Sequence, residues 1–135
     1  MVTDIIKLND NRLLISTLKN GLFIYDGKNI NPWQLQDKGI IQKNRINCLT
    51  AINNEKISIG TLTGGLFIID TIGKVWQNID ISKGLQSNDI LNAHKDGLGN
   101  LWLVLNNGID YIEINSPFSL IEPDGDLRGT GYDVK

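Results

Sequence analysis

The feature that most constrains this chain is a stretch of sequence that occurs in three related copies. The copies are "NDNRLLISTLKNGLFIYD" (9–26), "NNEKISIGTLTGGLFIID" (53–70) and "GLGNLWLVLNNGIDYIEI" (97–114). Thr17, Thr61 and Leu105 are spaced 44 residues apart, and Gly108 comes one residue early because the third loop is shorter. Repetition at this period indicates an architecture built by stacking one supersecondary unit.

The similarity extends over the rest of each unit. "KNRINCLTAI" (43–52) aligns with "SNDILNAHKD" (87–96), and aromatic residues stand near the unit ends at Trp33, Trp76 and Phe118. We therefore divide residues 1–135 into units of about 1–44, 45–88 and 89–131. Residues 132–135 then open a further unit, with a strand beginning around Tyr132 to Val134.

Each unit contains four short apolar runs separated by Gly, Asn and Asp. In the middle unit these runs are 46–52, 56–61, 65–70 and 74–79. Their length and punctuation predict strands joined by tight turns. No segment has apolar residues spaced three and four apart over three turns, so no helix is expected.

The run "GLFIID" is apolar at consecutive positions, so the sheet that contains it needs a partner on both faces. A four-stranded sheet that repeats every 40 to 50 residues and is covered by its neighbours is a propeller blade. The sequence therefore predicts an all-β fold: a β-propeller fragment of about three four-stranded antiparallel blades with a period of 44 residues.

The segments "GNLWLVLNNGI", "KISIGTLTGGLFIID" and "KGLQSNDILNAHKD" resemble the two-component regulator propeller repeat. The third copy is the most similar, whereas Leu14 and Ser58 replace the Trp of the repeat in the first two copies. The resemblance implies the periplasmic or extracytoplasmic sensor region of a bacterial hybrid two-component regulator, especially of Bacteroidetes. In such proteins a three-Tyr immunoglobulin-like domain, a membrane helix and a histidine kinase usually follow the propeller.

The function that the resemblance implies is non-catalytic sensing of a ligand, a glycan or glycan fragment, in signal transduction. Binding would shift the relative arrangement of paired extracytoplasmic regions. Two alternatives remain open. One is a propeller scaffold that binds a partner protein, and the other is part of a propeller lyase or glycosidase whose catalytic residues lie outside this segment.

Composition excludes several classes of partner. The formal charge is −2 with acidic and basic residues interspersed, which gives no reason to expect nucleic acid or a membrane surface as a partner. No apolar run approaches the roughly 18 residues of a membrane helix, and the N-terminal residues do not read as a signal peptide. Cys48 is the only cysteine, so no internal disulfide is expected.

No catalytic, cofactor or metal site is predicted from the residues that could carry chemistry. "DGLGN" (96–100) has the composition of a hairpin turn and lacks the spaced carboxylates of a calcium loop. His94 has no orienting carboxylate or nucleophile beside it, and Cys48 is expected to be a small buried thiol. The tryptophans are assigned to packing, and Asp124 and Asp126 to an exposed turn.

One set of polar residues is expected to gather on a single rim. In a propeller, the loop that enters the innermost strand and the loop between the second and third strands lie at the same end. Amides and hydroxyls there suit an oligosaccharide, although a solvated polar rim is the simpler alternative. The candidate ligand-binding residues are Lys19, Asn20, Lys43, Asn44, Arg45, Thr63, Ser87, Asn88, Asp89, Asn106 and Asn107.

Three blades are fewer than the four to eight or so of a closed propeller, so two apolar blade faces are left uncovered. The sequence therefore predicts self-association, with two copies closing a six-bladed ring as the simplest arrangement.

Overall fold

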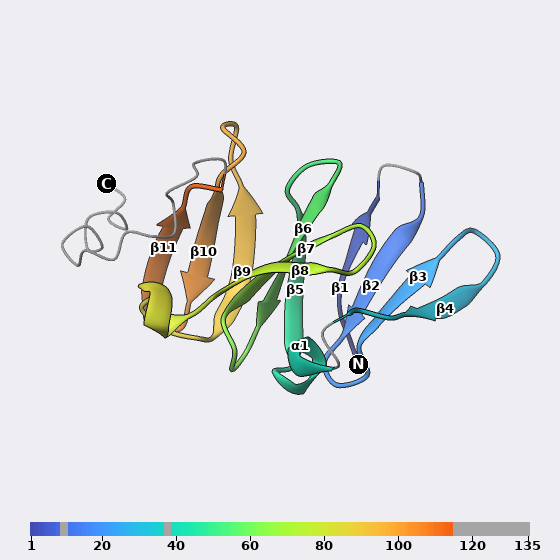
Figure 1. The fold of residues 1–135 in the computed structure, drawn as a ribbon, viewed down its shortest axis with the longest axis horizontal. Coiled ribbons are helices and arrows are strands. Elements are labelled where there is room, and N and C mark those ends of the chain that lie inside the picture. The colour runs from blue at the N-terminus through green and yellow to red at the C-terminus, as the bar shows by residue number, and fades with distance from the viewer. Residues whose placement is uncertain (9–10, 37–38, 115–135) are drawn as a thin grey trace.

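The chain forms three antiparallel sheets that stand side by side in sequence order (Figure 1). We describe a computed structural model, which defines residues 1–8, 11–36 and 39–114. The first sheet consists of β1 (Val2–Lys7), β2 (Leu13–Thr17), β3 (Leu22–Tyr25) and β4 (Ile30–Trp33). The second consists of β5 (Ile46–Ala51), β6 (Lys56–Thr61), β7 (Leu66–Asp70) and β8 (Val75–Ile79). The third consists of β9 (Ile90–Lys95), β10 (Leu101–Leu105) and β11 (Gly108–Ile112).

Each sheet is a simple meander in which every strand pairs with the strand that follows it in the chain. This arrangement confirms the predicted all-β propeller fragment, and the middle blade matches the predicted runs to within a residue at each strand end. The fourth strand expected near Phe118 and the strand expected at Tyr132 to Val134 lie outside the described residues, as do Asp124 and Asp126.

Two short helical turns connect the blades, and each is shorter than the three turns of apolar spacing that the sequence lacks. The turn α1 (Ile40–Lys43) precedes β5, and the 3₁₀ turn η1 (Ile81–Lys83) precedes β9. The Asp80 side chain accepts a hydrogen bond from the Ser82 N–H at 2.9 Å and so caps the start of η1. A single turn is too short to produce the apolar periodicity by which helices are detected in sequence.

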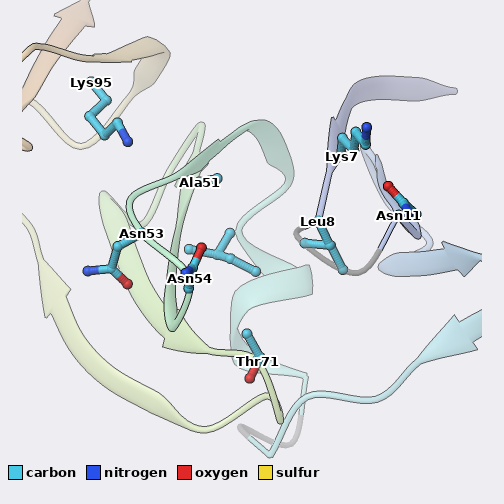
Figure 2. A pocket seen from close by; sticks show the side chains of 9 residues that line it. Lys7, Leu8, Asn11, Ala51, Asn53, Asn54, Thr71 and Lys95 are labelled. Atoms are coloured by element: carbon cyan, nitrogen blue, oxygen red, sulfur yellow. The ribbon is translucent and has the colours of Figure 1, made fainter.

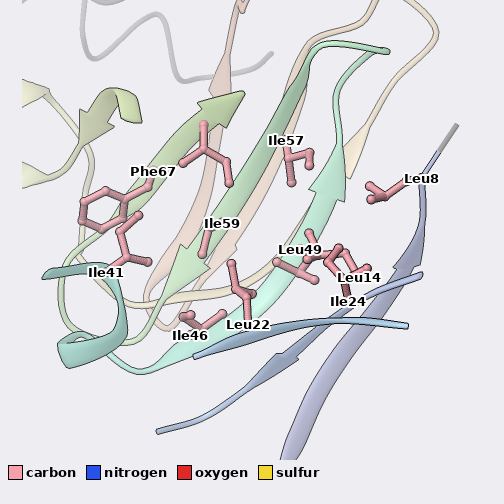
Figure 3. Packing of buried hydrophobic residues seen from close by; sticks show 11 residues of the cluster. Leu8, Leu14, Leu22, Ile24, Ile41, Ile46, Leu49, Ile57, Ile59 and Phe67 are labelled. Atoms are coloured by element: carbon pink, nitrogen blue, oxygen red, sulfur yellow. The ribbon is translucent and has the colours of Figure 1, made fainter. Parts of the chain in front are cut away.

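The middle blade is covered on both faces, as its continuous apolar runs require. Alternate residues of β7 point to opposite sides, so Phe67 and Ile69 pack against the first sheet while Leu66 and Ile68 pack against the third. Figure 3 shows the first of these two cores, in which Leu14, Leu22 and Ile24 face the middle blade. Burial on both sides is what makes the blades dependent on one another.

The second and third blades pack closely at Gly60, which lies on β6 beside β5 of its own sheet and β9 of the next. A Cβ atom on Gly60 would lie 2.5 Å from the Cys48 sulfur and 2.7 Å from Cγ2 of Ile90, both shorter than ordinary contacts. Asn47 then joins the two inner strands, because its side-chain amide donates to the Ile90 carbonyl at 3.1 Å. Glycine at position 60 therefore permits the close contact between the second and third blades.

The repeated loops between the second and third strands have the same structure in the first two blades. Thr17 Oγ1 donates to the Gly21 carbonyl at 2.8 Å, and Thr61 Oγ1 donates to the Gly65 carbonyl at 2.7 Å. Gly21 and Gly65 both have positive φ, at 86° and 80°. The sequence repeat thus preserves one turn, in which the threonine closes the loop and the glycine supplies the left-handed conformation.

Substitution of Gly60 by Ala should lower the free energy of unfolding by about 1–3 kcal/mol, because the added methyl group overpacks the blade junction. Urea unfolding followed by circular dichroism measures the change. Gly97→Ala is the matched control: a Cβ there meets nothing within 4 Å, so its effect should stay within about 0.5 kcal/mol. Equal effects of the two substitutions would show that Gly60 does not limit the approach of the blades.

Candidate ligand-binding site

The predicted ligand-binding residues lie in loops at one end of the blades, which we call the lower rim after its position in Figure 1. The loop between β2 and β3 holds Lys19 and Asn20, and the segment from α1 to β5 holds Lys43, Asn44 and Arg45. The loop between β6 and β7 holds Thr63, and the segment between η1 and β9 holds Ser87, Asn88 and Asp89. The loop between β10 and β11 holds Asn106 and Asn107.

Much of the hydrogen-bonding capacity of the lower rim is used within the protein. Thr63 Oγ1 donates to the Asn44 side-chain oxygen at 2.9 Å, while the Asn44 amide donates to the Ile40 carbonyl at 2.9 Å. The Asn88 carbonyl accepts from the Gly65 N–H at 2.8 Å, and its side-chain oxygen accepts from the Ile81 N–H at 2.9 Å. These side chains fasten one loop to the next.

Other members of the predicted set are also involved in local structure. The Ser87 hydroxyl is hydrogen-bonded to the Asp89 carboxylate. The Gln42 amide donates to the Lys19 carbonyl at 2.7 Å and connects α1 to the first blade. A small cavity of about 190 Å³ lies on this rim, and Asn20 is the one predicted residue among those that line it.

Asp110 is a residue that the sequence reasoning missed. Its carboxylate is fully buried and accepts hydrogen bonds from the Gln86 backbone N–H at 2.9 Å and the Gln86 side-chain amide at 2.6 Å. It thereby holds the segment after η1 against the third blade. The repeat carried a signal, since Asp110 occupies the position of Phe23 and Phe67 in the other two copies.

A larger cavity lies at the opposite end, which we call the upper rim after its position in Figure 1, near the turns that join β5 to β6 and β9 to β10. Figure 2 shows the side chains that line this cavity. Its volume is about 410 Å³, within the range of about 300–1,000 Å³ that is usual for small-molecule sites. The cavity draws on all three sheets and on the hairpin between β7 and β8. It is lined by Lys7, Leu8, Asn11, Ala51, Asn53, Asn54, Ile57, Thr71 and Lys95.

The lining combines amides, a hydroxyl and two ammonium groups with an aliphatic surface. Asn11 and Asn54 supply amides that donate and accept, and Asn53 supplies an amide donor. Lys95 supplies a cation whose amine donates to the Ile52 carbonyl at 3.1 Å. Ile57 is 2% exposed and belongs to the apolar core. Among the described residues that line the cavity, none is acidic.

The hairpins at the blade ends share one hydrogen-bonding pattern, in which a side-chain oxygen accepts from backbone N–H groups of the turn. Asn53 Oδ1 accepts from the Glu55 and Lys56 N–H groups at 2.8 and 2.9 Å. Asp96 Oδ1 accepts from the Leu98 and Asn100 N–H groups at 2.9 and 3.1 Å. Asp26 and Asp70 cap the outer hairpins of the first two blades in the same way. "DGLGN" is therefore a capped hairpin turn, as predicted.

These hydrogen bonds lower the pKa of the capping carboxyl groups. At Asp26, hydrogen bonds from the Asn29 and Lys28 N–H groups are the main cause. At Asp70 and Asp96, partial desolvation raises the pKa, but it is outweighed by hydrogen bonds from backbone N–H groups and from an indole N–H. The charged form is thus favoured at all three hairpins.

Two of the three tryptophans are tied to these carboxylates. Trp76 Nε1 donates to Asp70 Oδ2 at 3.1 Å, and Trp102 Nε1 donates to Asp96 Oδ2 at 3.1 Å. The Trp102 ring also lies 4.7 Å from the Tyr111 ring, centroid to centroid. Trp33 is partly buried against the core between the first two blades. The prediction of packing holds for Trp33, whereas Trp76 is 52% exposed, beneath the amines of Lys56 and Lys74.

The residues that could support catalysis are not assembled into a reactive group in the described part of the chain. Cys48 is buried, and burial together with the nearby Asp4 carboxylate raises its pKa to about 12. His94 lies exposed on β9, opposite Trp102 on the neighbouring strand. Within residues 1–8, 11–36 and 39–114, no cluster of His, Cys, Asp and Glu is suited to hold a metal ion.

Two solved structures share this fold. Both are crystal structures of the extracellular domain of one B. thetaiotaomicron protein, described as a one-component system in the first case and as a hybrid two-component system in the second. Each superposes with a TM-score of 0.69 at 24% sequence identity. The matches cover 82% and 83% of this chain. They confirm the fold that the resemblance to propeller repeats implies.

The chain spans 17% of the length of these solved domains. No protein-family model matches the chain, and neither does any curated protein sequence. Among the described residues, no helix is long and apolar enough to cross a membrane.

The free energy of unfolding should fall at acid pH because of the capping carboxylates. Their folded-state pKa values lie below the ordinary 3.8, so the unfolded chain binds more protons in acid. Their contribution is complete above pH 3.8 and is lost as the pH falls through the folded-state values. Urea midpoints measured from about pH 6 to about pH 2 should show this decline. The double variant Asp70→Asn, Asp96→Asn should have a flatter profile, and an unchanged profile would contradict this origin.

Cys48 should not react with iodoacetamide in the folded protein near pH 8, because the thiol is both buried and protonated. Mass spectrometry should show labelling only after urea is added. A cysteine introduced at the exposed position 94, by His94→Cys, is the positive control and should be labelled rapidly. Fast labelling of native Cys48 would show that the junction between the second and third blades opens readily.

Proposed function

We propose that this chain is a ligand-binding segment of an extracytoplasmic sensor propeller in a hybrid two-component regulator, and that it responds to a glycan. The observation that carries the proposal is the fold shared with extracellular domains of such a system, together with an upper-rim cavity built from all three blades. The solved domains are described as parts of signalling systems, and this chain corresponds to a short part of their length.

The chemistry of the upper-rim cavity supports an oligosaccharide as the ligand. Sugar hydroxyls both donate and accept hydrogen bonds, and the Asn54 amide and the Thr71 hydroxyl offer the same combination. Leu8, Ala51 and Ile57 supply an aliphatic surface for the carbon–hydrogen faces of a sugar ring. Lys95 adds a cation, which favours a saccharide that carries a carboxylate or sulfate over a neutral one.

The proposed role is binding rather than turnover. Glycoside hydrolysis needs two carboxyl groups that flank the scissile bond, and the described residues of this cavity supply none. Signalling then requires that the ligand bind one arrangement of the blades more tightly than another, so that the population shifts toward it.

Isothermal titration calorimetry against a panel of neutral and acidic oligosaccharides tests the proposal. Asn54→Ala and Thr71→Val should each weaken binding about two- to tenfold, the usual effect of losing one hydrogen bond. Asn107→Ala, on the lower rim, is the matched control and should leave the affinity unchanged. If Asn107→Ala alone weakens binding, the ligand site is on the lower rim. If no saccharide in the panel binds, the glycan proposal is wrong.

A further inference from the structure

The connections that follow the first two blades differ on the lower rim. After the second blade, the Asn78 side-chain amide donates to the Gly64 carbonyl at 3.0 Å and to the Leu66 carbonyl at 3.2 Å. The Lys83 amine donates in turn to the Asn78 carbonyl at 2.7 Å. An amide and an ammonium group thus bind backbone carbonyls at this end of β7 and β8.

At the equivalent positions after the first blade, neither donor is present. In the strand register, Pro32 has the position that Asn78 has in the second blade. Gly39 has the position of Lys83, which stands 44 residues later. Neither proline nor glycine carries a side-chain donor. These two side-chain partners are therefore missing from the matching carbonyls of the first blade, which are those of Asn20, Leu22 and Pro32.

The lower-rim cavity of about 190 Å³ lies where these donors are missing. Its lining includes Gly39 and the three residues that carry the matching carbonyls. A Cβ atom built on Gly39 meets nothing within 4 Å, so the space into which a side chain would extend from this position is open. The cavity therefore occupies the place that donors of the chain itself fill after the second blade.

The lining favours a cation over an anion. Among the described residues that line the cavity, none has a charged side chain. Trp33 lines the cavity at the register position of Ile79 in the second blade. A tryptophan ring attracts an ammonium group through its face, and carbonyl oxygens accept the hydrogen bonds of that group. An anion would meet no positive side chain in this lining and would face the same carbonyl oxygens.

Gln42 contributes one more acceptor beside the cavity. Its side-chain amide donates to the Lys19 carbonyl at 2.7 Å, and a Cβ atom built on Gly21 would lie 2.9 Å from its side-chain oxygen. Gly21 and Gln42 both line the cavity. The hydrogen bond to Lys19 thus fixes the amide so that the Gln42 oxygen faces the loop that borders the cavity.

We propose that the lower-rim cavity binds the primary ammonium group of a small amine. The N–H groups of the amine donate to the three matching carbonyls, and the Trp33 ring lies against the cation. The bound amine thereby supplies the donors that the chain itself supplies after the second blade. The described lining residues all belong to the first blade, to the connection after it or to β5. This site is separate from the upper-rim cavity, so the proposal is independent of the proposed glycan.

Titration of the chain with n-butylammonium chloride, followed by nuclear magnetic resonance of the backbone and side-chain N–H groups, tests the site. We expect a Kd of about 1–20 mM, as is usual for a ligand of this size, with shifts concentrated at Asn20, Trp33 and Gln42. Sodium chloride at the same concentrations is the control for ionic strength and should not produce these shifts. If n-butylammonium shifts none of the lining residues, the site is wrong.

Two further probes separate the charge from the hydrogen bonds. n-Butanol has the same carbon chain without the charge, and tetramethylammonium has the charge without an N–H group. Each should bind about tenfold more weakly than n-butylammonium. Equal binding of n-butanol would contradict the selection of a cation, and equal binding of tetramethylammonium would contradict the role of the carbonyls.

Installing the missing amide gives an independent measurement. Pro32→Asn places a donor where the second blade has Asn78, so it should weaken n-butylammonium binding about tenfold and raise the urea midpoint of unfolding. Pro32 is exposed, so circular dichroism should show that the strands are kept. Pro32→Ala removes the ring without adding a donor and should weaken binding less than Pro32→Asn does.

Ile30→Asn is the matched control for the introduced asparagine. Ile30 is on the same strand and 59% exposed, and it is not among the residues that line the cavity, so this variant should bind n-butylammonium as the wild type does. If Pro32→Ala or Ile30→Asn weakens binding as much as Pro32→Asn does, the added amide is not the cause and the assigned acceptors are wrong.

Discussion

The structure depends on a middle sheet that is apolar on both faces. In β6 and β7 of the middle blade almost every residue is buried, so that sheet is stable only with a neighbour on each side. Burial is the main favourable term in folding, and here it is divided between two cores that meet at one sheet. The repeat in the sequence follows from this need, since stacking one unit lets each copy cover the next.

A small number of polar contacts fixes the conformation of the loops and the alignment of adjacent blades. Thr61 closes the loop between β6 and β7, and Asp96 closes the hairpin between β9 and β10, each through two or more hydrogen bonds to nearby backbone groups. Side chains such as Asn47 then fix how the inner strands of adjacent blades meet. Among the described residues, no buried side-chain nitrogen or oxygen lacks a hydrogen-bond partner. Burial of the apolar faces therefore requires a neighbouring blade, and hydrogen bonds determine how that blade is aligned with the first.

The sequence was informative where a local pattern repeats and less so where function needs residues from several blades. Strand limits in the middle blade could be predicted because glycine and asparagine punctuate each apolar run. The lower-rim loops could be placed for the same reason, but not the hydrogen bonds that engage Asn44 and Thr63. The upper-rim cavity could not be predicted from the sequence, because Asn11, Asn53 and Lys95 belong to different blades and no short motif shows that they line one cavity. The special role of Asp110 could have been predicted, since a carboxylate stands there at the repeat position of Phe23 and Phe67.

Lys95 connects the upper-rim cavity to the packing of the blades. Its amine closes the junction between the second and third sheets through the Ile52 carbonyl, and the same side chain lines the cavity. An anionic group in the cavity would compete with that carbonyl for the amine, since charged acceptors form the stronger hydrogen bonds. Ligand binding and blade arrangement would then share one group, and the coupling is reciprocal: whatever strengthens the Lys95 contact at the junction weakens its contact with a ligand. Such a shared group would let a ligand bind two arrangements of the blades with different affinity, and a ligand shifts the population only to the extent of that difference.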